Sequence, residues 1–176
     1  MSSRDEIGDP QIERLRDPKG AHSEAWGQTL EELQLLADDR REDGWEAETI
    51  VAAHTDTVSR DMKDHDRYGL MHIIPNNHAE VFEEYYEDGA FTDYLLYANH
   101  LEAFVYAVIE WIDPENERSI FMAARYDMSR AKGMIESAYD EGVLYSYVKT
   151  VDGTILARFP YEEFEAFITP PDQADS

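Results

Sequence analysis

Apolar and polar positions follow a regular pattern between Ala103 and Asp127, where two apolar runs are separated by a short charged turn. The runs are rich in β-branched and aromatic residues, and Pro114 lies in the turn between Asp113 and Glu115. These features favour two strands joined by a turn over one continued helix. We therefore predict that this segment forms the central hairpin of a sheet.

The register of this hairpin decides which side chains share a face. We expect Asp113 to face Arg118 across the turn, which sorts the side chains onto two faces with a period of two. One face is uncharged along the whole first strand and is the predicted core face. The other face is also largely apolar, but it contains Glu110 and Arg125 together with Tyr106. This second face is the more informative one for function.

The segments on either side predict the cover of this hairpin. Apolar residues at helical spacing predict a long amphipathic helix from about Ser23 to Asp43, with Ser23 as its N-cap and Gly44 at its end. The other expected elements are strands at 44–55, 69–75 and 91–101, and helices at 77–88, 128–141 and 160–168.

A second hairpin is predicted near the end of the chain. Asp152 and Gly153 lie between alternating residues and predict a two-residue type I′ turn, in which Tyr147 faces Arg158. The outward face of this hairpin carries Tyr145, Tyr147, Lys149 and Arg158. Tyrosine and arginine are enriched at protein interfaces, so this patch is a candidate contact for a homodimer or a protein partner. The alternative is an ordinary amphipathic strand face.

Together these elements predict an α+β fold in a single domain over residues 22–169. We expect a mostly antiparallel or mixed sheet of about six strands with helices packed on it. A flexible N-terminal arm at 1–21 and a flexible tail at 170–176 flank this domain. The order of the strands does not follow from the sequence.

Charge narrows the classes of partner. The chain has 39 Asp and Glu against 15 Lys and Arg, a net charge of −24, which repels phosphate backbones and anionic membranes. We therefore expect no nucleic-acid and no membrane binding. The acids are interleaved with 43% hydrophobic residues, so the chain is not a disordered acidic tail. In molar salt the Debye length is about 3 Å, so this coat predicts a halophilic, cytoplasmic protein with bound salt cations.

Motifs of common chemistry are missing from the sequence. The chain has no cysteine, which excludes disulfides, thiolate metal sites and a cysteine nucleophile. Its six histidines lack the i, i+4 spacing of a zinc-binding helix, and there is no nucleophile elbow, phosphate-binding glycine loop or dinucleotide fingerprint. No stretch approaches the roughly 18 apolar residues of a membrane span. We expect no metal and no cofactor, and a binding protein is favoured over an enzyme.

The second face of the central hairpin gives the alternative hypothesis. Glu110 is flanked by apolar residues, so its carboxylate would be desolvated and would need a cation or hydrogen-bond donors. Glu110, Arg125 and Tyr106 are therefore the candidate ligand-binding residues of a small-molecule-binding protein or enzyme. A buried structural ion pair or a solvated sheet face explains the same residues without a ligand. The leading hypothesis remains non-enzymatic binding or assembly, through self-association or a protein partner.

One group of segments stands out for its likeness to other proteins: VIEWIDPENERSIFMAARYD, residues 131–142, YSYVKTVDGTILARF, Trp26 and REDGWE. Together these segments resemble a family of haloarchaeal proteins of unknown function. Shared features are an acidic residue before an Asp-Pro turn, here Glu110 and Asp113-Pro114, and the tyrosine-rich last hairpin. The likeness spans about 25–159. It implies a halophilic archaeal source and a single domain, and it assigns no activity and no catalytic residues.

Overall fold

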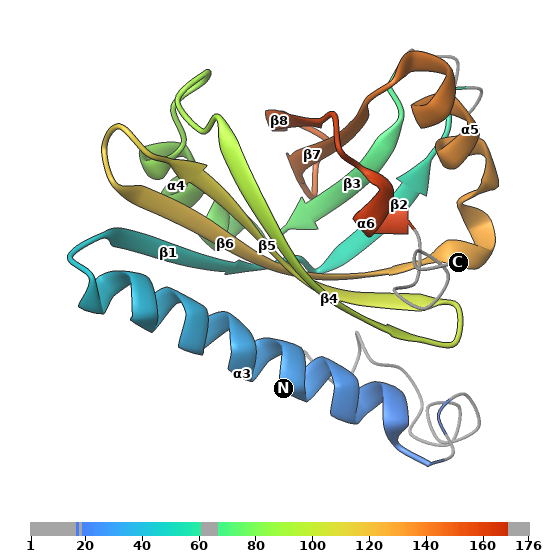
Figure 1. Cartoon of the computed structure of the whole chain (residues 1–176), viewed down its shortest axis with the longest axis horizontal. Helices are drawn as coiled ribbons and strands as arrows, with labels where there is room; N and C mark the ends of the chain where they lie inside the picture. Colours follow the sequence, from blue (N-terminus) through green and yellow to red (C-terminus); the bar gives the residue numbers. More distant parts are fainter. Residues whose placement is uncertain (1–16, 18, 61–66, 169–176) are drawn as a thin grey trace.

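The computed structural model describes residues 17, 19–60 and 67–168. In these residues the chain is a single α+β domain, as predicted, but its eight strands divide into two four-stranded sheets (Figure 1). Sheet A has the order β1 (Glu46–Val51), β6 (Arg118–Asp127), β5 (Phe104–Asp113) and β4 (Asp93–Leu101). Sheet B has the order β2 (His54–Val58), β3 (Gly69–Ile74), β7 (Leu144–Thr150) and β8 (Ile155–Tyr161). The predicted tail and all but four residues of the predicted arm lie outside the described residues.

Both sheets are mixed. Within sheet A, β1 runs parallel to β6, and within sheet B, β3 runs parallel to β7; the other pairings are antiparallel. The described helices are α3 (Ala21–Glu42), α4 (Asn76–Tyr85), α5 (Lys132–Glu141) and α6 (Glu165–Ile168), with a 3-10 turn, η2 (Met128–Arg130). Helix α3 lies along the outer face of sheet A (Figure 1).

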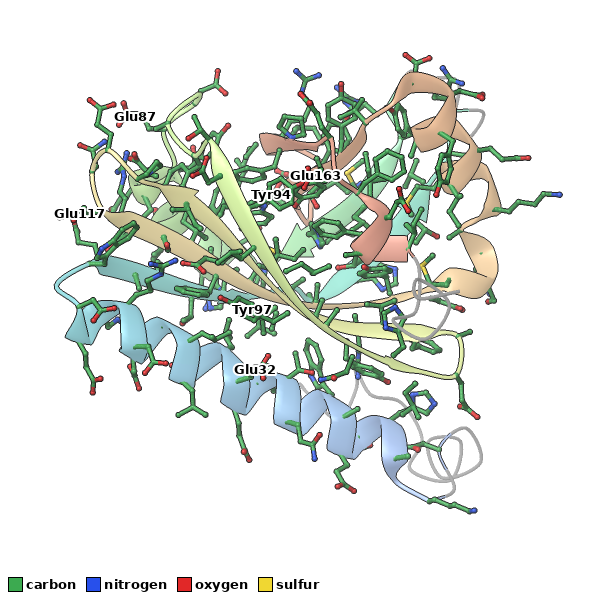
Figure 2. The ribbon with its side chains drawn as sticks, viewed as in Figure 1. Glu32, Glu87, Tyr94, Tyr97, Glu117 and Glu163 are labelled. Atoms are coloured by element: carbon green, nitrogen blue, oxygen red, sulfur yellow. The ribbon has the colours of Figure 1, made fainter. Side chains whose placement is uncertain are left out.

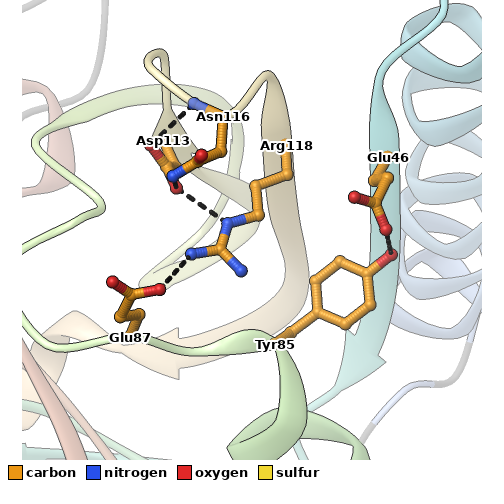
Figure 3. A network of polar contacts seen from close by, with 6 residues as sticks. All are labelled: Glu46, Tyr85, Glu87, Asp113, Asn116 and Arg118. Carbon is orange, nitrogen blue, oxygen red and sulfur yellow. Dashed lines mark hydrogen bonds and ion pairs between the residues drawn. The ribbon is translucent and has the colours of Figure 1, made fainter.

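The register of the central hairpin is confirmed. Asp113 pairs with Arg118 and Glu110 pairs with Phe121. The turn is held by side chains, because Asp113 accepts hydrogen bonds from Arg118 Nε at 2.7 Å and from Asn116 Nδ2 at 2.8 Å (Figure 3). Burial alone would raise the pKa of Asp113, but these bonds outweigh burial and lower its pKa. The charged turn therefore fixes which face of the hairpin turns inward.

The core lies between the two sheets. The predicted core face of the hairpin is buried there, including Trp111, whose ring stacks on that of Phe159 from sheet B with centroids 4.0 Å apart. Stacked aromatic rings bury a large area at low conformational cost. The core is thus built from the inner faces of both sheets.

The chain crosses from sheet A to sheet B through two alanines. Ala52 N donates to Ala123 O at 3.0 Å, and Ala53 N donates to Ile73 O at 2.8 Å, so the peptide bonds of the step pair with both sheets. The single strand predicted at 44–55 is therefore two strands, and β2 occupies part of a segment predicted as loop. The two alanines, which we call the alanine step, therefore join the sheets on the side of β1 and β2.

Helix α3 begins differently from the prediction. Its N-cap position is Gly20 and not Ser23. Asp17 supplies the capping carboxylate, because its side chain accepts hydrogen bonds from the backbone nitrogens of His22 at 3.0 Å and Ser23 at 2.9 Å. A carboxylate before the first turn satisfies unpaired N–H groups and complements the helix dipole.

The turn of the last hairpin also differs. Gly153 N donates to Thr150 O at 3.0 Å, and Gly153 has a φ of 97° whereas Asp152 is not in the positive-φ region. A type I′ turn needs positive φ at both central positions, so the predicted turn is wrong, and glycine alone takes the left-handed position of a longer loop. The predicted facing of Tyr147 and Arg158 is confirmed.

Candidate functional site

The outer face of sheet B has no helix over it in the described part of the chain. Its apolar cluster consists of Val58, Met71 and Tyr147, and the partly buried side chains packed against them, Tyr145 and Ile155, also come from strands or their ends. Three of the four predicted interface residues lie at or beside this cluster. The tyrosine-rich patch thus lies at a sheet face that no described helix covers, although Val58, Met71 and Tyr147 are themselves buried.

A hollow of about 540 Å³ lies at this surface. It is lined by Arg60, Arg67, Tyr68, Glu141, Tyr145, Tyr147, Ile155 and Arg158. We call it the arginine–tyrosine hollow. It contains the predicted residues Tyr145, Tyr147 and Arg158, while Lys149 lies outside its lining. Arg60, Arg67 and Tyr68 were not predicted, since they reach the site only through the pairing of β2 with β3 and of β3 with β7.

Gly69 allows the two strands to approach closely at this point. It has a φ of 132°, and a Cβ atom there would lie 2.0 Å from the carbonyl oxygen of Tyr145. This approach brings the ring of Tyr68 edge-on to that of Tyr145, with centroids 5.4 Å apart. Tyr68 is also anchored by its hydroxyl, which donates to Val143 O at 2.7 Å. A glycine without a side chain is therefore a requirement of the site.

Two arginines stack on these tyrosines. The guanidinium of Arg158 lies 4.9 Å from the ring centroid of Tyr145, and that of Arg60 lies 5.8 Å from the centroid of Tyr68. Arg60 is also paired with two carboxylates, from Nη1 to Glu141 Oε2 at 2.7 Å and from Nη2 to Asp140 Oδ2 at 3.4 Å, so its charge is already balanced within the chain. Arg158 is exposed. Stacking leaves the edges of a guanidinium available as donors to a carboxylate or phosphate.

Burial keeps the hydroxyls of Tyr68 and Tyr147 protonated, because it raises the pKa of both. Burial raises the pKa of Tyr68 to about 12, and Arg60 opposes that rise. Burial also raises the pKa of Tyr147, against the effect of Arg158 and Arg67. Among the described lining residues, three guanidinium groups lie beside the carboxylate of Glu141, in a chain of net charge −24. The arrangement suits an anionic group that also offers surface for aromatic contact.

The candidate ligand residue Glu110 lies under α3 and is 1% exposed. Its Oε2 accepts hydrogen bonds from Arg40 Nε at 2.7 Å and from Ser119 Oγ at 2.6 Å, and its Oε1 accepts one from Tyr97 OH at 3.5 Å. Figure 2 shows Tyr97 between β4 and α3. Arg40 is 70 residues away in sequence, and no local pattern pointed to it. The structure gives Glu110 the partners of a buried structural ion pair.

Tyr106 and Arg125 face each other across β5 and β6, as predicted. They lie four positions along the strands from Glu110, about 13 Å away at the usual rise per residue, so the three do not converge. Arg125 lies 4.7 Å from the ring centroid of Trp26, and Tyr106 OH is 2.6 Å from His22 Nδ1. Each is thus in contact with α3 or its first turn. A ligand role for these three residues stays a prediction.

A histidine and a serine also meet inside the sandwich. His72 Nε2 lies 3.0 Å from Ser146 Oγ, and His72 Nδ1 lies 2.9 Å from Thr55 Oγ1. Both His72 and Ser146 are fully buried, and burial lowers the pKa of His72 to about 3. A neutral, solvent-excluded imidazole bonded on both sides satisfies the polar groups of the core. We assign these residues a structural role.

Within the described ranges, no three His, Asp or Glu side chains gather in a way that could hold a metal ion. None of the helices described there has the length and apolar character needed to cross a membrane.

Comparison with known proteins places the chain in a family. A model of a family of unknown function, DUF7529, matches residues 12–169. The chain belongs to the DUF7529 family. The match takes in all the described strands and helices, so both sheets and α3 are parts of one DUF7529 unit. The predicted likeness to a family of unknown function is confirmed, and its haloarchaeal membership stays a prediction. No curated protein and no solved structure matches this DUF7529 chain.

Proposed function

We propose that this DUF7529 domain is a non-enzymatic binding protein, and that it binds an acidic segment of a partner protein at the arginine–tyrosine hollow. The observation that carries the proposal is the convergence of three arginines and three tyrosines at one hollow of a strongly acidic chain, on a sheet face with no described helix over it. Guanidinium groups supply bidentate donors to carboxylates, and tyrosine rings supply contact area at low entropic cost.

A protein partner is favoured over a small anion by the surroundings of the hollow. Tyr145 and Ile155, which are only partly buried, add aromatic and apolar surface beside the arginines, while Val58 and Met71, packed against them, are buried. Interface hot spots combine such apolar area with aromatic and arginine side chains. A free carboxylate or phosphate would use the guanidinium groups alone.

High salt is compatible with this recognition. The net charge of the chain repels an acidic partner over long distances in dilute buffer. In molar salt the Debye length is about 3 Å, so the long-range field is screened and pairs in direct contact decide the affinity. Acidic segments of a halophile's own proteins then become suitable partners.

The test is a binding titration on the full chain in molar KCl, with a labelled hexaglutamate peptide as the probe and hexaglutamine as its neutral control. Arg158→Gln should weaken hexaglutamate binding by about tenfold, since one charge-assisted pair is lost. Arg130→Gln, which removes an exposed arginine outside the hollow, should leave it within about twofold. Equal losses in both variants, or equal binding of the two peptides, would contradict the proposal.

Light scattering in molar KCl tests the homodimer form of the proposal. A dimer that dissociates in Arg158→Gln would make a second copy of the chain the partner. A strict monomer of the natural sequence would leave only a different protein as the partner.

We also propose that the domain is halophilic and cytoplasmic, with salt cations bound to its surface. Its support is the acidic, lysine-poor composition with a normal apolar content. Circular dichroism in low salt should show loss of structure that molar KCl restores, because mutual repulsion of the carboxylates is then screened. Full stability in dilute buffer would rule this out.

A further inference from the structure

A second hollow of about 380 Å³ lies between β4 of sheet A and β8 of sheet B. It is distinct from the arginine–tyrosine hollow, although Arg158 lines both. Its lining is dominated by aromatic side chains, which are Tyr86, Phe91, Tyr94, Trp111, Phe159 and Tyr161. We call it the aromatic cleft. Its volume is within the usual range of small-molecule sites.

The floor of the cleft is made of buried rings with satisfied polar atoms. Trp111 and Phe159 stack with an interplanar angle of 4°. Trp111 Nε1 donates to the hydroxyl of Tyr161 at 2.8 Å. The polar edge of the indole is thus engaged inside the core, and these three buried rings support the cleft from below, without much exposed surface of their own.

The walls are three partly buried rings. Tyr86 stacks on Phe91 with centroids 6.0 Å apart, and it meets Phe159 edge-on at 5.4 Å. Tyr94 stands on β4, and its hydroxyl donates to Glu163 O at 3.2 Å; Figure 2 shows the two residues side by side. Tyr86 and Phe91 come from the stretch that follows α4, where Tyr86 also stacks on Phe82 at 5.4 Å, and Tyr94 comes from β4. As the partly buried rings of the lining, these three are the ones that a ligand can reach.

The wall that carries Phe91 is fixed by the network at the turn of the central hairpin. Arg118 Nη2 bonds Glu87 Oε1 at 2.9 Å, and Arg118 Nε bonds Asp113, so the segment after α4 is tied to the turn (Figure 3). The guanidinium of Arg118 also lies 5.2 Å from the ring centroid of Phe91. Since this wall is already ordered, little entropy is lost there when a ligand binds.

The charges around the cleft favour a cation. Asp88 and Asp93 lie in its lining against Arg158. Asp88 accepts a hydrogen bond from Tyr86 OH at 3.0 Å, and the guanidinium of Arg158 lies over Tyr145. Aromatic faces attract cations, and the net charge of −24 draws cations toward the molecule.

We infer that the aromatic cleft is a cage for a small organic cation of the quaternary ammonium class. Such a cation has no N–H group to pair and is large enough to contact several rings at once, which is the chemistry that aromatic cages recognise. The inference is independent of the proposed function, because it concerns another hollow and a ligand of opposite charge.

The test is calorimetric titration of the full chain in molar KCl with choline and with 3,3-dimethyl-1-butanol, its uncharged isostere. Choline should bind saturably and at least about fivefold more tightly than the alcohol, because only the cation interacts with the ring faces electrostatically. Equal affinity for the two compounds, or no saturable binding of choline, would overturn the inference.

Variants on one strand locate the binding. Tyr94→Leu should weaken choline binding by about tenfold, while Tyr94→Phe keeps the ring and should stay within about twofold. Leu95→Ala is the matched control, since the neighbouring side chain is 44% exposed and points to the opposite face of β4. Unchanged binding in Tyr94→Leu would sink the inference. If circular dichroism shows that Tyr94→Leu does not fold, Phe91→Leu is used as the test variant in its place.

The variant Arg158→Gln distinguishes the proposed peptide binding from the inferred cation binding. It should keep or strengthen choline binding and weaken hexaglutamate binding, since it removes a cation from the lining of both hollows. Loss of choline binding in Arg158→Gln would count against the cage and leave the peptide result untouched.

Discussion

The outer faces of the two sheets carry similar residues and have different cover. Each is an apolar and aromatic strand surface with charged side chains inside it. On sheet A, α3 lies over the face, and Glu110 is buried against Arg40 from that helix. On sheet B, the exposed Arg158 stacks on Tyr145 with no described helix above it.

This difference shows how burial changes the partners that a charged side chain needs. A buried carboxylate has lost its hydration, so it must find a cation and donors within the same chain. A guanidinium that lies on a ring at the surface keeps its hydration and its donors, and it can exchange water for an external anion. Charged residues within an apolar strand pattern thus indicate a candidate site only where the charged group itself stays exposed, as Arg158 does.

The largest expected effect is on the covered face. Glu110→Leu should lower the free energy of unfolding by about 3–5 kcal/mol, because it leaves the Arg40 guanidinium without its buried partner. Denaturant unfolding in molar KCl measures this. The double variant Glu110→Leu with Arg40→Leu should regain most of the loss. A single-variant loss below about 1 kcal/mol would show that the pair is not buried in solution.

On sheet B the corresponding requirement is the close approach of two strands. Gly69→Ala should cost at least about 2 kcal/mol more than Gly44→Ala. Both glycines have positive φ, but a Cβ at Gly44 meets nothing within 4 Å, whereas one at Gly69 meets the Tyr145 carbonyl. Thermal and denaturant unfolding compare the two. Equal costs would mean that β3 and β7 can separate without penalty.

His72, which is buried between the two sheets, makes the stability of the chain depend on pH. Burial lowers the pKa of His72 to about 3, from an ordinary value of 6.5. Below pH 6.5 the unfolded chain binds a proton that the folded chain does not, so stability falls as the pH drops from 6.5 toward 3. The slope is roughly 1.4 kcal/mol per pH unit, or about 2 kcal/mol at pH 5.

His72→Gln is the control for this titration, because it keeps hydrogen-bonding capacity and cannot be protonated. Between pH 7 and pH 5 the natural chain should lose about 2 kcal/mol more than His72→Gln. Parallel stability curves would show that His72 is not a source of the pH dependence. Asp113 contributes at lower pH, since its pKa lies below the ordinary value and its stabilisation is lost only under stronger acid.

The smallest expected effect on stability is at Arg158, on the outer face of sheet B. Arg158→Gln should change the free energy of unfolding by less than about 0.5 kcal/mol, because the side chain is exposed and its stacking is worth little there. Its effect should be seen in peptide binding instead. A loss comparable with that of Glu110→Leu would erase the distinction between the two faces.

Local patterns predicted the central hairpin well. A period of two and a charged turn around Pro114 were enough to place Asp113 opposite Arg118, since both act over a few residues. The type I′ turn failed because Asp152 stays out of the positive-φ region and Gly153 alone provides it. A dipeptide signal does not decide between a two-residue turn and a longer loop with one left-handed glycine.

Features that depend on distant parts of the chain were not predicted. Neither sheet of four strands has a local signal, because the change of sheet happens at two ordinary alanines between β1 and β2. Arg40 meets Glu110 only because α3 lies across sheet A. Arg67 and Tyr68 join the predicted tyrosine patch only through the parallel pairing of β3 with β7.

The alanine step also determines how the sandwich can open. Main-chain bonds from Ala52 and Ala53 hold both sheets on that side, while the aromatic cleft separates β4 from β8 on the other. Partial unfolding should therefore start at the cleft side, and amide hydrogens of β4 and β8 should exchange with solvent before those of β6. An organic cation bound between β4 and β8 would bind only the closed form and would therefore slow that exchange. Opening of the core and release of the cation would then be coupled.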